Sequence, residues 1–116
     1  SEEKRRKLAA AGAEIQVLPA EGGRIALADM LRWLADNEQV NELLVETGAT
    51  LAGALLEANL VDELQLFVAP TLLGGEARPL FALPGITQMA DQKRLTIKES
   101  RTVGQDWWIT ATPHAD

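Results

Sequence analysis

The sequence contains no cysteine and a single histidine, and only 4% of its 116 residues are aromatic. Without cysteine the chain can form neither a disulfide framework nor a thiolate zinc site, and it has no thiol nucleophile. His114 lies close to the C-terminal end, which excludes a histidine cluster and an internal Ser-His-Asp triad. We expect His114 to belong to a solvated tail, and we expect no metal site in the chain.

Basic residues are scarce through most of the chain. Residues 8–77 contain two, Arg24 and Arg32, against eleven acidic residues, and the formal net charge is −6. A chain without a basic stripe is a poor match for nucleic acid. No run of about 18 apolar residues and no secretory leader is present, so we expect no membrane span and a cytoplasmic location. The start at Ser1, directly in a helical pattern, indicates a fragment of a longer protein.

The hydrophobic residues, 47% of the chain, are sufficient for one packed domain, and their spacing changes along the sequence. In the first half, segments with the 3.6-residue period of a helix alternate with short apolar or alternating segments typical of strands. Glycines follow the first helical segment and form a turn at residues 21–23. Helices are predicted at Glu2–Ala11, at Ile25–Asn37 and from Ala49 onward, and strands at Ala13–Leu18 and Leu43–Val45.

The second half has the alternating pattern of β-strands. Strands are predicted at Glu63–Ala69, Arg94–Val103 and Trp107–Thr112, the last two joined by a hairpin turn, with an irregular stretch at Thr71–Asp91. Trp107 and Trp108 must point to opposite faces, so we expect one in the core and one at an interface. The element order predicts an α/β domain with a mixed, mostly parallel sheet, flanking helices and a C-terminal antiparallel hairpin.

The most informative segment runs from Leu43 to Ala54. A buried strand ends at Glu46, a glycine turn follows, and a helix of small residues begins near Ala49. Ligands of open α/β sheets gather at the carboxyl ends of strands, and the free amides of a helix start can hold a phosphate without lysine. Alternatively, the small residues only allow the helix to pack tightly on the sheet.

Glu46 is an ionisable residue placed where a buried strand emerges. Its carboxylate could accept hydrogen bonds from a hydroxyl or amine of a ligand. It could equally cap the nearby helix start, where negative charge is favourable. The sequence alone leaves both roles open.

At this segment the sequence resembles the reductase domain of riboflavin biosynthesis, which usually forms the C-terminal part of a bifunctional deaminase/reductase. The resemblance extends over nearly all 116 residues. The segments that carry it are Val45-Glu46-Thr47-Gly48-Ala49-Thr50-Leu51-Ala52-Gly53-Ala54-Leu55-Leu56, Leu60-Val61-Asp62-Glu63-Leu64, Ala69–Gly75, Val103–Asp106 and Gly12–Pro19.

The resemblance implies a dihydrofolate-reductase-like fold. It also implies NADPH-dependent reduction of the ribosyl group of 5-amino-6-(5-phosphoribosylamino)uracil to a ribityl chain. By the same resemblance, Glu46 contacts the substrate and the cofactor pyrophosphate rests on the helix start. The NADPH site is then lined by Gly48, Ala49, Thr50, Leu51, Ala52, Gly53 and Ala54.

Two departures from the family pattern bear on function. Thr47 stands where many relatives carry glycine or alanine, which is acceptable if its φ stays negative. The family domain is also longer, and neither its N-terminal half nor the zinc-dependent deaminase domain has a counterpart here. We therefore expect residues 1–116 to be the C-terminal part of the reductase domain, inactive alone and associating as a homodimer. The alternative is a non-catalytic α/β dimerisation or regulatory module derived from that fold.

Overall fold

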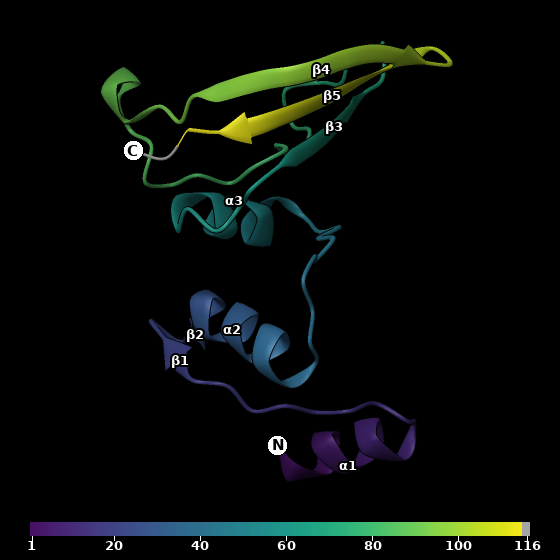
Figure 1. The fold of residues 1–116 in the computed structure, drawn as a ribbon, viewed down its shortest axis with the longest axis vertical. Helices are drawn as coiled ribbons and strands as arrows, with labels where there is room; N and C mark the ends of the chain where they lie inside the picture. Colours follow the sequence, from purple (N-terminus) through teal and green to yellow (C-terminus); the bar gives the residue numbers. More distant parts are fainter. Residues whose placement is uncertain (115–116) are drawn as a thin grey trace. The chain divides into compact units, whose positions relative to one another are not determined.

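A computed structural model describes residues 1–114 of the chain (Figure 1). The chain forms two compact units, Ser1–Leu43 and Leu44–Asp116, and each is described here by itself. Within residues 1–114, no helix is both long and apolar enough to cross a membrane.

The first unit contains two helices and a small hairpin. Helix α1 (Glu2–Ala10) starts at Ser1, whose hydroxyl accepts a hydrogen bond from the Lys4 amide, and it ends before Gly12 as predicted. The hairpin pairs β1 (Ala20–Glu21) with β2 (Arg24–Ile25) across the predicted glycine turn. Gly22 and Gly23 both have positive φ, as a two-residue turn of this kind requires. Helix α2 (Leu27–Asn37) forms where a helix was predicted, and its large apolar side chains are half-buried.

The second unit is built on a three-stranded antiparallel sheet of order β3-β5-β4. Its strands, visible together in Figure 1, are β3 (Leu64–Val68), β4 (Leu95–Val103) and β5 (Asp106–Pro113). Strands β4 and β5 form the predicted hairpin, and a bulge interrupts their register between Ile97 and Glu99. Helix α3 (Ala49–Glu57) precedes the sheet, and a short 3₁₀ helix, η1 (Met89–Asp91), precedes β4. Among the described residues of this unit, the buried apolar side chains are Leu55, Leu56 and Ala111.

The two tryptophans of β5 belong to opposite faces of this sheet, but neither is a core residue. Trp108 is half-buried in a cross-strand row with Phe67 and Arg101. Its ring stacks on that of Phe67, with centroids 5.8 Å apart and planes inclined by 6°, and the Arg101 guanidinium lies 3.9 Å from the Trp108 centroid. Trp107 is 51% exposed. The prediction that one tryptophan is in the core is therefore wrong, and Ala111 occupies the buried position of β5 instead.

The predicted parallel strands do not form in the described residues. Ala13–Leu18 and Leu43–Val45 are irregular, and every strand pair within residues 1–114 is antiparallel. A strand requires a hydrogen-bonded neighbour, and the described chain offers none to these segments. Leu44 is accordingly 77% exposed rather than buried on both faces. The expectation of a mostly parallel sheet is thus incorrect for this chain. No strand of the described residues lies between α2 and α3, so the predicted alternation of helices and strands is not found there either.

His114 is also placed differently from the prediction. Although it is exposed, its amide donates a 2.9 Å hydrogen bond to the Arg94 carbonyl, which extends the β4–β5 pairing. Its ring Nε2 lies within hydrogen-bond distance of the Thr96 hydroxyl. His114 is therefore attached to the sheet rather than part of a frayed tail.

Candidate functional site

The N-terminal end of α3 presents free backbone donors. Gly48 caps the helix in an extended conformation, and the first intrahelical hydrogen bond runs from the Ala52 amide to the Gly48 carbonyl, at 3.2 Å. The amides of Ala49, Thr50 and Leu51 therefore have no partner within the helix. No side chain caps this end, and no acidic residue lies in its first turn. Together with the positive end of the helix dipole, these three amides are an arrangement that could bind an anion.

The space in front of this helix end is open within the described unit. Nothing lies within 4 Å of where a Gly48 side chain would start, and Thr50 and Leu51 are exposed. The backbone can therefore be approached closely by a ligand. A pyrophosphate would fit this set of donors, because backbone amides at a helix start can bind an anion without the help of basic side chains.

Glu46 lies just before this helix and is exposed. Its side chain makes no hydrogen bond or ion pair with residues 1–114. The capping role that the sequence left open is therefore not used in this structure. The carboxylate is available to accept hydrogen bonds from a ligand placed beside the helix start.

Gly53 does not face this open space. It is buried against the segment Leu80–Gly85, here called the strap, which Figure 1 shows passing beside α3. A Cβ atom on Gly53 would lie 1.9 Å from the Ala82 carbonyl oxygen. The Ala82 amide also donates a 3.0 Å hydrogen bond to the Ala49 carbonyl. The strap thus occupies the side of α3 on which Gly53 lies.

The predicted site residues are therefore divided between two sides of α3. Gly48, Thr50 and Leu51 lie on open backbone next to Glu46, while Ala49 also accepts the strap hydrogen bond. Ala52 and Ala54 are half-buried.

The strap itself was missed, because glycine and proline near it predicted only an irregular stretch. The apolar run from Leu80 to Leu83 was the available signal that part of this stretch packs.

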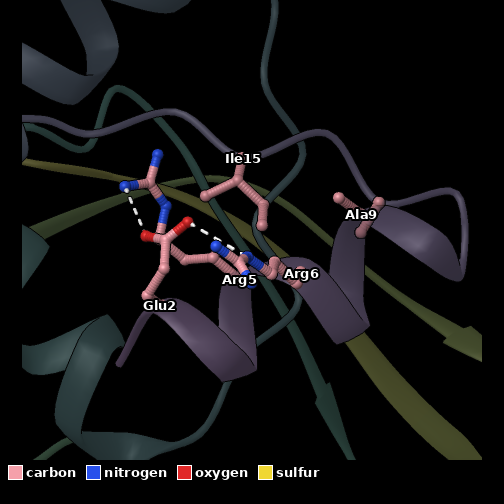
Figure 2. Close-up of a pocket in the computed structure, with 6 residues that line it drawn as sticks. Glu2, Arg5, Arg6, Ala9 and Ile15 are labelled. Carbon is pink, nitrogen blue, oxygen red and sulfur yellow. Dashed lines mark ion pairs between the residues drawn. The ribbon is translucent and has the colours of Figure 1, made fainter.

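A separate hollow lies in the first unit, between α1 and the extended chain at Ile15 (Figure 2). The Glu2 carboxylate pairs with both Arg5 and Arg6, at 3.7 Å each. All three side chains are more than half exposed. The two guanidinium groups are thus partly neutralised, and the hollow carries none of the predicted site residues.

Residues 1–109 match the family model described as the RibD C-terminal domain. The chain belongs to the RibD C-terminal domain family. It is 46% identical over 90 residues to the riboflavin biosynthesis protein RibD of Escherichia coli, covering 78% of this chain and 24% of that protein. It is 43% identical over 74 residues to a 2,5-diamino-6-ribosylamino-4(3H)-pyrimidinone 5′-phosphate reductase of Methanothermobacter thermautotrophicus, covering 63% of this chain and 34% of that protein.

Solved structures show the same relationship. Acinetobacter baumannii RibD superposes with a TM-score of 0.82 at 33% identity, over 95% of this chain and 29% of that chain. The α/β, dihydrofolate-reductase-like fold implied by the resemblance is therefore confirmed, as a partial domain. The chain spans about a quarter of the length of the RibD proteins it matches.

Proposed function

We propose that this chain forms the C-terminal part of a reductase that uses NADPH to convert the ribosyl group of 5-amino-6-(5-phosphoribosylamino)uracil to a ribityl chain. Family membership supports the reductase role. Several relatives are named as reductases of phosphorylated ribosylamino-pyrimidines, among them one from Buchnera aphidicola that is named for this uracil. The proposed location is the cytoplasm, as expected from the sequence.

The observation that carries the proposal is the open helix start beside a free carboxylate. The amides of Ala49, Thr50 and Leu51 would donate hydrogen bonds to the cofactor pyrophosphate, with Gly48 allowing close approach. Glu46 would accept a hydrogen bond from a substrate hydroxyl or amine and so orient the sugar. The nicotinamide, when bound, supplies the hydride, and the chain's own contribution is position and electrostatics.

We propose further that other polypeptide segments complete this site. A family reductase must also hold the substrate phosphate, and residues 8–77 contribute only two basic side chains. We expect the N-terminal half of the reductase domain to supply that clamp. A zinc-dependent deaminase domain is expected in the parent protein, as the resemblance implies.

We also propose that the isolated chain associates as a homodimer through the free edge of β3. Its sequence, Leu-Gln-Leu-Phe-Val, has no charge or proline, and Phe67 and Val68 are 64% and 49% exposed. The other edge, β4, carries Lys98, Glu99 and Arg101 beside a bulge. Charges and bulges discourage edge-to-edge pairing, so β3 is the edge that favours it.

A chimera tests the enzymatic role. The matching 90-residue segment of the E. coli relative is replaced by this chain, and substrate-dependent NADPH oxidation is measured. We expect turnover in the chimera and loss of turnover when the segment is deleted. A folded chimera that binds neither NADPH nor substrate would favour the non-catalytic module instead.

A further inference from the structure

Three contacts attach the strap to α3 along its whole length. At the helix start, the Ala82 amide donates to the Ala49 carbonyl at 3.0 Å. In the middle, Gly53 lies directly against the Ala82 backbone. At the helix end, the Gly85 amide donates to Glu57 Oε1 at 2.9 Å. The strap therefore runs in the same direction as α3, and it is attached at both ends of the helix.

The contact at the helix start coincides with the anion-binding amides. Ala49 accepts the strap hydrogen bond through its carbonyl, while its own amide is one of the three free donors. The strap is therefore hydrogen-bonded to the backbone of the first turn of α3. None of the strap contacts uses a side chain at the open face, so the strap can act on that face only through the helix backbone.

We propose that the strap sets the position of the α3 N-terminus, and that Gly53 is a positioning residue for the amides that bind the cofactor pyrophosphate. This inference rests on the proposed function of those amides. It replaces the predicted role of Gly53 as a lining residue: its missing side chain is needed for contact with the strap rather than with the cofactor.

The steric argument is strong because the neighbour is backbone. A Cβ atom placed 1.9 Å from the Ala82 carbonyl oxygen is far inside the 3.0 Å below which real Cβ contacts are essentially absent. A methyl group at position 53 would therefore have to separate the two backbones by about 1 Å. Since the Ala82 amide donates a hydrogen bond to the Ala49 carbonyl, that separation would either break the hydrogen bond or displace the start of α3. Binding geometry is sensitive to displacements of this size.

The test compares four variants of the 116-residue chain in NADPH binding and in amide hydrogen exchange. Gly53→Ala introduces the clash, and Gly75→Ala is the matched control, because nothing lies within 4 Å of that position and its φ is not positive. Glu57→Ala removes the remote attachment of the strap, while Glu57→Gln keeps an acceptor for the Gly85 amide. Circular dichroism establishes that each variant is folded.

We expect Gly53→Ala to raise the Kd for NADPH by at least about tenfold and to increase exchange at the Ala82 amide. Gly75→Ala should leave both unchanged. Glu57→Ala should raise the Kd by a smaller factor, and Glu57→Gln should restore it, although Glu57 lies at the far end of α3 from the proposed site. This rescue at a distance is not expected of a residue that only stabilises the fold.

A folded Gly53→Ala protein with unchanged Kd or unchanged Ala82 exchange would overturn the inference. If Gly53→Ala does not fold, equal Kd values for Glu57→Ala and the wild type would overturn it instead. Failure of the wild-type chain to bind NADPH would contradict the binding role proposed for the α3 amides, and this inference with it. Normal wild-type binding with no effect of the strap variants would contradict the positioning role alone.

Discussion

The Ala82 amide donates a 3.0 Å hydrogen bond to the carbonyl of Ala49, the first residue of α3. Two segments separated by more than thirty positions in the sequence are thereby joined at the point where the helix exposes its free amides. A helix end with three unbonded donors must be held firmly to bind a ligand in one geometry. The hydrogen bond and backbone contact of the strap supply such support to α3.

The first prediction concerns the stability of Gly53→Ala. Helix propensity alone would make this change stabilising by about 1 kcal/mol. The clash with the Ala82 backbone should outweigh that gain, because overpacking of a tight contact costs about 1–3 kcal/mol or more. Urea denaturation should therefore give a lower free energy of unfolding than for the wild type. An increase in stability would show that the strap moves aside freely.

A second prediction separates stability from binding at the helix start. Thr50→Glu places a carboxylate in the first turn of α3, which should stabilise the helix by about 0.3–1 kcal/mol. The same charge should repel a pyrophosphate and weaken NADPH binding. Thr50→Gln is the uncharged control and should change binding much less. Tighter NADPH binding by the Glu variant would contradict the proposed role of these amides.

The third prediction concerns the role of Glu46 in turnover by the active chimera. Glu46→Gln should lower kcat/KM by about tenfold or more, because a hydrogen bond to a charged group contributes about 1.5–3 kcal/mol. The thermal midpoint should stay within a few degrees of the parent, since the side chain is exposed and makes no hydrogen bond or ion pair with residues 1–114. A lower thermal midpoint with unchanged kinetics would reassign Glu46 to a structural role.

The fourth prediction concerns the isolated 116-residue chain, which we expect to show no reductase turnover and to form dimers. Val68 and Thr102 lie in the same cross-strand row, on either side of Trp107, but on opposite edges of the sheet. Val68→Lys should therefore shift the mass in light scattering toward the monomer, whereas Thr102→Lys should not. A wild-type chain that is strictly monomeric at micromolar concentration, or that turns over substrate, would contradict this account.

The local elements of the fold could be predicted from the sequence. The apolar period of Leu27–Asn37, the glycines at 22–23 and the alternation on both sides of Gly104 each specify structure within a few residues. These elements form because their stabilising contacts are near in sequence. The predicted helix start at Ala49 was found for the same reason.

The parts that could not be predicted depend on partners distant in sequence. Leu43–Val45 has the composition of a buried strand, but pairing needs a neighbouring strand that no local pattern can supply. The strap has no periodicity of its own and acquires its place from Gly53 and Glu57. The small residues of α3 stand out in the sequence, but their pattern could not show which of them lies against the strap.

The central claim, that the N-terminal amides of α3 bind the cofactor pyrophosphate, is tested most directly by titrating the ¹⁵N-labelled chain with NADPH. The account predicts that the largest saturable changes in amide chemical shift occur at Ala49, Thr50 and Leu51, and that inorganic pyrophosphate competes for them. Saturable changes confined to other residues, or none at these three amides, would contradict it.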